Sequence, residues 1–168
     1  MVRLVRPVRR TVIICGEGKS EEAFFLHLRQ IYTCGRPDSP RVTVKKAGGK
    51  GSNNVIYTLI RQAARAQFDK LVACLDMDLP PDAEASREAK RKRILRIELY
   101  PCLEAFLLEI LGHAAPVTSA ACKQRLTQVD QRAPFEQGFF DDHFPRNVLD
   151  ARRHAIPALD TLLRVFDA

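Results

Sequence analysis

The chain has 168 residues, of which 46% are hydrophobic and 28% are charged, and its formal net charge is +7. This length suits one domain with its own core, and the composition excludes a disordered chain and an integral membrane protein. The excess positive charge indicates a polyanionic partner such as nucleic acid, although a solvated basic surface gives the same balance. We therefore expect a single domain over residues 1–168 and no membrane partner.

The cysteines indicate a reducing compartment. Five are present, no two form a CxxC pair, and one would remain if the other four were bridged. Together with the four histidines they show no zinc-finger spacing, so a structural zinc site is not expected. The apolar run near the N-terminus is too short for a signal peptide, and no segment reaches the roughly 18 apolar residues of a membrane span. These features predict a cytoplasmic protein.

The first predicted unit is a strand, a glycine turn and a helix. The apolar run Thr11–Cys15 is typical of a buried strand, and the glycines of the segment 16–18 end it. Apolar residues then recur at helical spacing after Ser20. Glu21 and Glu22 follow Ser20, as acidic residues do in the first turn of a helix.

Strands and helices continue to alternate downstream. This alternation predicts βαβ units and a small, mostly parallel four-stranded sheet with helices on both faces, which is a three-layer α/β fold. Strand-like runs begin at Val42 and span Lys70–Leu75 and Arg96–Tyr100; helical patterns span Val55–Phe68, the charged segment after Pro81, and Cys102–Leu111, with Pro101 in the first turn.

The last third of the chain has weaker patterns. We expect a core over about residues 10–115 and a helical C-terminal extension over about 116–168. In that extension Lys123–Val129 has helical spacing, the segment 133–145 is irregular and aromatic, and Val148–Phe166 is helical with an interruption at Pro157. The sequence assigns the extension no function.

Carboxylates follow two of the predicted strands. Glu17 lies just past the first strand, and Asp76 and Asp78 end the third. Ligands gather at the carboxyl ends of parallel strands, so three carboxylates meet if these strands are neighbours. In an extended segment Asp76 and Asp78 also share one side, with Met77 facing away. Such a cluster favours a bound Mg²⁺ or Mn²⁺, although each carboxylate alone also fits an ordinary turn or helix cap.

The segment Gly18-Lys19-Ser20 also matches the end of the phosphate-loop signature G-x-x-x-x-G-K-[ST]. That signature needs its first glycine at position 13, which is Ile13. A β-branched residue there removes the glycine that opens the phosphate-wrapping loop. A small nucleotide kinase or NTPase remains the second hypothesis, because Asp76 follows its strand as a Walker B aspartate does.

Three segments together resemble a known family. "IICGEGKSEEAFF" and "LVACLDMD" resemble the Toprim domain of topoisomerases, primases and OLD-family nucleases. The further segment "YPCLEAFLLEIL" is similar to the Pro-Cys-aromatic-Glu motif of the RloB-like branch. The three occur in the order found in that family and span Thr11 to Leu111.

The resemblance implies a Toprim-like, Rossmann-like fold and specific roles for five carboxylates. Glu17 matches the general acid or base near the scissile phosphodiester, and Glu21 matches a second acidic position of the catalytic motif. Asp76 and Asp78 match the metal-binding pair, and Glu104 would complete a metal site with them and Glu17. The sequence departs from the family pattern near Glu104 at Tyr100, Leu103 and Ile110.

Lysines near these carboxylates indicate a route for a nucleic-acid backbone. Lys19 is close enough in sequence to Glu17 to neutralise a phosphate oxygen. A Lys19 side chain that only faces solvent is an equally good interpretation. Lys45, Lys46 and Lys50 belong to a glycine-rich loop after the second strand, at the same edge of the sheet. They are expected either to bind a phosphate backbone or to form a mobile surface turn.

The predicted function is a metal-dependent nuclease or a related phosphodiester-transfer enzyme, since carboxylates supply both cation ligands and a proton-transfer group. The resemblance further implies a role in phage defence or restriction and an ATPase partner that this chain lacks. A third hypothesis is a non-enzymatic module, with a degenerate Toprim site, that binds nucleic acid or protein.

Other motifs are interpreted as structural. Asp141-Asp142-His143 lies in an irregular segment and is expected at the surface, and Arg152-Arg153-His154 is expected to decorate a helix. Ser20 and Cys15 have no histidine placed beside them by the pattern, so no nucleophile is predicted.

Overall fold

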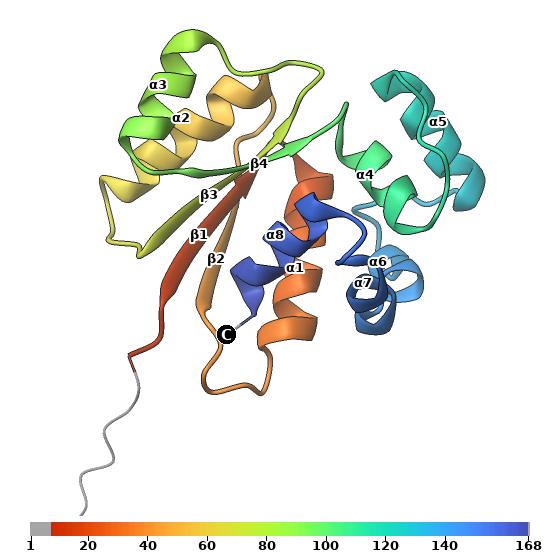
Figure 1. Ribbon diagram of the computed structural model, residues 1–168, viewed down its shortest axis with the longest axis horizontal. Coiled ribbons are helices and arrows are strands. Elements are labelled where there is room, and N and C mark those ends of the chain that lie inside the picture. Colours follow the sequence, from red (N-terminus) through yellow and green to blue (C-terminus); the bar gives the residue numbers. More distant parts are fainter. Residues whose placement is uncertain (1–7, 168) are drawn as a thin grey trace, which may run out of the picture.

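The apolar runs that predict strands pair with one another in a single sheet. In the computed structural model, which describes residues 8–167, four strands lie parallel in the order β2-β1-β3-β4, and helices cover both faces (Figure 1). The predicted three-layer α/β fold with a parallel four-stranded sheet is confirmed. The strands span Thr11–Gly16 (β1), Arg41–Lys46 (β2), Lys70–Asp76 (β3) and Leu95–Leu99 (β4).

Two apolar layers lie on opposite faces of the sheet because side chains alternate along each strand. On β1, Val12 and Ile14 belong to one layer and Ile13 and Cys15 to the other, and all four are buried. A strand covered on both faces has no polar side, so the run is apolar throughout. The first layer includes α1 (Lys19–Thr33), α4 (Leu103–Ile110) and α8 (Pro157–Phe166), and the second includes α2 (Gly51–Ala63) and α3 (Ala83–Arg91).

Two helix starts differ from the prediction. Helix α2 begins at Gly51, earlier than predicted, because the backbone at Lys50 and Gly51 turns with φ of 71° and 75°. Pro101 was expected in the first turn of α4, which is wrong: Cys102 is the N-cap and the helix begins at Leu103. The backbone N–H of Leu103 donates to a side-chain oxygen of Asp76, so a residue of β3 fixes where α4 starts.

The C-terminal part of the chain returns to the sheet. Helix α8 packs on α1 and β4, and its apolar residues belong to the first layer. Pro157 occupies the first turn of α8, where its missing N–H costs nothing. The segment predicted to be irregular contains a short helix whose Phe140 ring stacks on Phe24 at 5.0 Å between centroids. The remaining helices are α5 (Ser119–Val129), α6 (Phe139–His143) and α7 (Arg146–Arg152).

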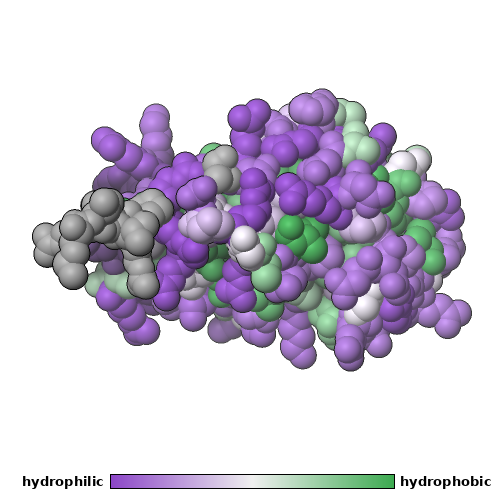
Figure 2. All heavy atoms as spheres, turned by 90° about the horizontal axis from the view of Figure 1, so that it is seen from below, coloured by the Kyte–Doolittle hydropathy of each residue, from purple (hydrophilic) through white to green (hydrophobic). Residues whose placement is uncertain are grey.

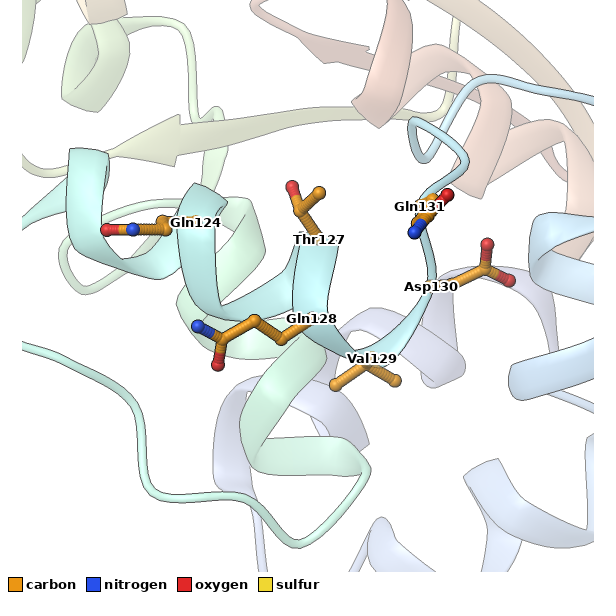
Figure 3. A pocket seen from close by; sticks show the side chains of 6 residues that line it. All are labelled: Gln124, Thr127, Gln128, Val129, Asp130 and Gln131. Atoms are coloured by element: carbon orange, nitrogen blue, oxygen red, sulfur yellow. The ribbon is translucent and has the colours of Figure 1, made fainter.

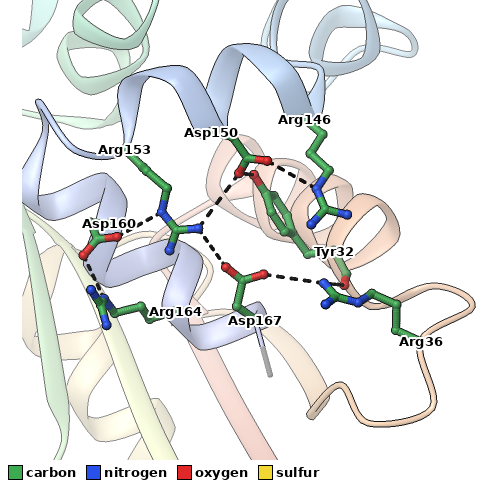
Figure 4. Close-up of polar contacts among 8 residues, drawn as sticks. All are labelled: Tyr32, Arg36, Arg146, Asp150, Arg153, Asp160, Arg164 and Asp167. Carbon is green, nitrogen blue, oxygen red and sulfur yellow. Dashed lines mark hydrogen bonds and ion pairs between the residues drawn. The ribbon is translucent and has the colours of Figure 1, made fainter.

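A network of ion pairs joins α7 and α8 to the end of α1 (Figure 4). Arg153 donates from Nε to Asp160 at 3.0 Å and from Nη1 to Asp167 at 2.9 Å. The hydroxyl of the buried Tyr32 donates to Asp150 at 2.6 Å. The expectation that Arg153 only decorates a helix is therefore wrong, because its guanidinium bridges two carboxylates and is 19% exposed.

The described residues contain no helix with the length and apolarity needed to cross a membrane. All five cysteines are free thiols, and four of them are buried. The face seen in Figure 2 is mostly hydrophilic, with small, separate apolar areas. A mostly hydrophilic surface of this kind is ordinary for a folded domain and does not by itself mark a functional site.

Candidate functional site

Four carboxylates meet at the carboxyl edge of the sheet. Strands β1 and β3 are hydrogen-bonded neighbours, so Glu17, directly after β1, and Asp76, the last residue of β3, lie at the same edge. Glu21 and Glu104 come from the first turns of α1 and α4. All four line one open cavity of about 330 Å³. The structure thus brings together four of the five carboxylates singled out by sequence.

The fifth, Asp78, lies outside that cavity. Strand β3 ends at Asp76, and the backbone N–H groups of Met77 and Asp78 donate to the carbonyls of Leu99 and Pro101. Asp78 is exposed and accepts a hydrogen bond of 2.5 Å from the Ser119 hydroxyl of α5. Strand alternation was extended through Asp78 in the prediction, whereas the chain turns after Asp76.

Backbone N–H groups hold three of the cavity carboxylates by one oxygen each. This arrangement fixes each side chain and leaves its second oxygen without a hydrogen bond to the part of the chain that the structure describes. A backbone hydrogen bond to one oxygen of a carboxylate orients the other oxygen toward a metal or a substrate. The pairs are Gly51 N to Glu17 Oε1 at 3.2 Å, Gly18 N to Glu21 Oε2 at 3.1 Å, and Leu103 N to Asp76 Oδ1 at 3.0 Å.

The electrostatics of the cavity disfavour ionised carboxylates. Burial raises the pKa of Asp76 to about 8, and the negative charges of Glu21, Glu104, Asp78 and Glu17 add to the effect. Burial also raises the pKa of Glu21, against the opposing effect of its backbone hydrogen bonds. A cation in the cavity would reverse this shift, because it stabilises the charged form of every carboxylate around it.

The glycine-rich loop after β2 encloses Glu17. Gly48 N and Gly49 N each donate to the Glu17 carbonyl at 3.0 Å, and Gly51 N donates to its carboxylate. The backbone has positive φ at three glycines of this loop, a conformation that residues with a side chain rarely adopt: 83° at Gly48, 86° at Gly49 and 75° at Gly51. The side-chain amide of Asn54 donates to two carbonyls of this loop. The loop therefore serves to position Glu17.

The predicted lysines divide into two groups. Lys19 lines the cavity, and its Nζ lies 5.7 Å from the centroid of the Phe135 ring. Lys45, Lys46 and Lys50 are exposed beside the loop and do not line the cavity, and Lys46 pairs with Glu22 at 2.5 Å.

The structure adds two residues to the cavity that sequence reasoning missed, Lys123 of α5 and Phe135. Lys123 falls in a segment predicted as a helix, but nothing in its spacing says which way that helix packs. Phe135 follows a proline in a loop and carries no motif. Lys123 reaches the cavity through the packing of α5 against α4, and Phe135 reaches it from the loop after α5.

The turn before α1 does not form a phosphate loop. Ile13, where the signature needs glycine, is fully buried within β1. The Gly18 N–H, which would face a phosphate at the helix N-terminus, donates to the carboxylate of Glu21 instead. Gly16 has a different purpose: a Cβ there would lie 2.4 Å from the Glu21 Cβ. Gly16 therefore makes room for a glutamate.

The predicted metal ligands do not form a ready-made metal site in the described chain. Within residues 8–167, no three His, Cys, Asp or Glu side chains are arranged to hold a metal ion directly. Glu17, Asp76 and Glu104 nevertheless line one cavity, and two of them present an oxygen with no hydrogen bond inside the described chain. Mg²⁺ commonly keeps several waters and contacts only one or two carboxylates. The donor set of the cavity fits a hydrated Mg²⁺ or Mn²⁺ ion.

A larger cavity, of about 660 Å³, lies at the end of α5 and is lined mainly by polar side chains (Figure 3). Its one carboxylate, Asp130, is paired with Arg132 at 2.6 Å and with His143 at 2.8 Å. Asp142 also pairs with Arg132, and Asp141 lies 3.2 Å from the buried His27. Arg132 therefore neutralises Asp130 and Asp142, and these contacts hold α6 in place.

A third cavity, of about 370 Å³, lies beside the edge strand β2 and is rich in arginine. Arg9, Arg29 and Arg41 line it, and none of them forms an ion pair with any residue of the described chain. The Arg29 side chain donates to the Val42 carbonyl at 3.3 Å. Uncompensated positive charge of this kind suits a phosphate backbone.

No protein-family model matches the chain, and searches of curated proteins and of solved structures found no match. The Toprim resemblance is therefore a proposal, and the arrangement of side chains in the cavity carries the functional conclusion.

Proposed function

We propose that the protein is a metal-dependent nuclease, or a related phosphodiester-transfer enzyme, with a Toprim-like site. The observation that supports this proposal most strongly is the convergence of Glu17, Glu21, Asp76 and Glu104 on one cavity. Burial and the repulsion of neighbouring carboxylates raise the pKa of Asp76 to about 8, and a divalent cation is the simplest group that would offset both effects.

Asp76 and Glu17 would hold the ion, because backbone N–H groups orient both carboxylates toward the cavity by one oxygen. Glu104, on α4, is the third ligand available. When bound, the ion polarises a phosphoryl oxygen and stabilises the charge on the leaving oxygen. Asp78, tied to Ser119, has no direct part in this site.

Proton transfer is assigned to Glu17 and Glu21. Glu21 is buried and lines the same cavity, so it would transfer a proton at the cleaved phosphodiester. Glu17 holds the Toprim position next to the cleaved phosphate. Lys19 and Lys123 line the same cavity and would bind phosphate oxygens of the substrate.

Nucleic acid is the substrate that best suits the charges around this site. The formal net charge is +7, and the arginine cavity beside β2 has no acidic partners in the described chain. Lys45 and Lys50 are exposed and follow, in the chain, the β2 residues that line that cavity. From the Toprim and RloB-like resemblance we further propose a role in phage defence or restriction beside an ATPase partner.

The kinase or NTPase alternative is weaker because the Gly18 N–H is taken by Glu21 and position 13 is buried isoleucine. ATP binding that disappears in Lys19→Ala would favour that alternative. The binding-module alternative predicts nucleic-acid binding with no cleavage under any metal.

Cleavage of labelled DNA and RNA in Mg²⁺, Mn²⁺ or EDTA tests the proposal. We expect metal-dependent cleavage that is lost in Asp76→Asn and in Glu17→Gln. Asp38→Asn is the matched control, because Asp38 is exposed in the loop before β2 and does not line the acidic cavity. Cleavage that persists in both site variants, or equal loss in the control, would contradict the assignment.

A further inference from the structure

The acidic cavity continues into a second cavity along α5. The first has a volume of about 330 Å³ and the second about 390 Å³, and Ser20, Glu104, Lys123 and Phe135 line both. The second cavity extends from these residues along the loop 131–136. Together they form one groove that leads from Asp76 to the loop between α5 and α6, and each part has the volume of a small-ligand site.

Phe135 stands between the two parts of the groove. The chain has nine phenylalanines, all within the described residues, and Phe135 is the one classed as exposed, at 51%. A single exposed apolar side chain is common and means little. Its place matters more: the ring lines both cavities, and Lys19 Nζ lies 5.7 Å from its centroid.

The cations of the groove are of two kinds. Arg132 is committed to Asp130 at 2.6 Å and to Asp142 at 2.8 Å, so it is not available to a ligand. Lys19 and Lys123 form no ion pair within residues 8–167, although they line a cavity with four carboxylates. The groove is therefore lined by an aromatic ring, two unpaired ammonium groups and a carboxylate cluster.

We infer that this groove binds an unpaired nucleotide of a single-stranded nucleic acid, with its base stacked on Phe135 and its phosphate on Lys19 and Lys123. The inference rests on the proposed function and narrows its substrate to single strands or unpaired segments. A base that stacks on the Phe135 ring would replace the Lys19 ammonium there, so that Lys19 could contact the phosphate. Bases in a duplex are stacked on both faces, so the ring reaches only a base that lies outside a helix.

Binding measured without metal tests this inference separately from cleavage. Fluorescence anisotropy in EDTA would compare a labelled single strand, the matching duplex and a strand with abasic positions. Phe135→Ala is expected to weaken single-strand binding about tenfold or more and to leave duplex binding unchanged, since stacking acts on exposed bases. Phe135→Trp should bind single strands as the wild type does, and the abasic strand should bind the wild type as weakly as the intact strand binds Phe135→Ala.

Tyr100→Ala is the matched control, because Tyr100 is an aromatic residue 67% exposed that lines neither cavity. It should bind single strands normally, and circular dichroism should show both variants folded. Wild-type affinity in Phe135→Ala, or an equal loss of duplex binding, would overturn the inference. If single-strand binding depends on Phe135 but no cleavage occurs with any metal, the inference about the groove is supported and the proposed nuclease activity is contradicted.

Discussion

Two clusters of acidic residues in this protein are built on opposite principles. At the junction of α1, α7 and α8, each of Asp150, Asp160 and Asp167 lies within ion-pair distance of at least one arginine (Figure 4). The paired arginines lower the pKa of Asp160. In the cavity at the carboxyl edge, Asp76 instead faces other carboxylates and its pKa is raised to about 8. Aspartates that are paired with arginine thus stabilise the packing of helices, whereas carboxylates that face one another in a cavity are suited to bind a cation or transfer a proton.

The largest expected effect separates the two clusters by activity. Asp76→Asn should reduce metal-dependent cleavage at least about hundredfold, because it removes a charge that holds the ion. Asp160→Asn should leave the cleavage rate of the folded protein unchanged, since Asp160 only pairs with Arg153 and Arg164. Rates measured on labelled strands below the melting temperature of each variant check this. A similar loss of cleavage in both variants would contradict the separation into a catalytic and a structural cluster.

The two clusters should also respond oppositely to pH. Because the folded-state pKa of Asp76 exceeds its unfolded value of 3.8, the folded protein binds the extra proton between about pH 4 and 8. Its contribution to the free energy of unfolding therefore falls as pH rises through that window, by at most about 1.4 kcal/mol per pH unit. Asp160 has a lowered pKa, so its contribution is lost as pH falls.

Urea unfolding at pH 5 and pH 8 measures this difference. Asp76→Asn should be more stable than the wild type at pH 8 and close to it at pH 5, while Asp160→Asn should be less stable at both. Mg²⁺ should stabilise the wild type at pH 8 and leave Asp76→Asn unchanged. A wild type and Asp76→Asn with parallel pH profiles would show that Asp76 is not destabilised by its neighbours.

The structural cluster is expected to contribute mainly to stability. Arg153 is 19% exposed and lies within 4.0 Å of Asp150, Asp160 and Asp167. Arg153→Ala should lower the free energy of unfolding by about 1 kcal/mol, since it removes the arginine shared by three carboxylates, each of which keeps one other arginine. Arg146→Ala is a milder control, because Arg146 is 48% exposed and pairs with Asp150 alone. Equal losses in the two variants would contradict the role given to Arg153.

A change in the turn before α1 tests how that turn positions Glu21. Gly16→Ala would place a Cβ 2.4 Å from the Glu21 Cβ and should cost about 1–3 kcal/mol in unfolding free energy and reduce cleavage. Gly18→Ala is the matched control, since its Cβ would meet only Glu21 Oε2, at 3.6 Å. Chemical denaturation and cleavage assays on both variants check this. Wild-type behaviour in Gly16→Ala would show that Glu21 can shift without consequence.

The sequence predicts the site residues that follow strands better than those contributed by the helices and loops packed around the cavity. Glu17 and Asp76 were predicted at one edge because strand ends are visible as apolar runs that stop at polar residues. Asp78 was misplaced because local alternation does not reveal that the chain turns after Asp76. Lys123 and Phe135 were missed because their positions depend on how α5 packs against α4, a contact between segments that carry no shared pattern.

The ion-pair network was missed for a related reason. Arg153 is one of 27 basic residues in the chain, and its sequence neighbours are those of an ordinary helix surface. Only the return of α8 to the sheet places Asp160 and Asp167 around it. Long-range packing of this kind decides which charges are neutralised, and a single sequence does not display it.

The most direct test of the central claim is a crystal structure of the protein soaked in Mn²⁺, with anomalous diffraction recorded at the manganese edge. The carboxylate convergence predicts a peak in the cavity lined by Glu17, Asp76 and Glu104, within ligand distance of Asp76, and no peak near Asp150, Asp160 and Asp167. A well-ordered cavity with no anomalous peak at saturating Mn²⁺ would contradict the metal site and the nuclease proposed from it.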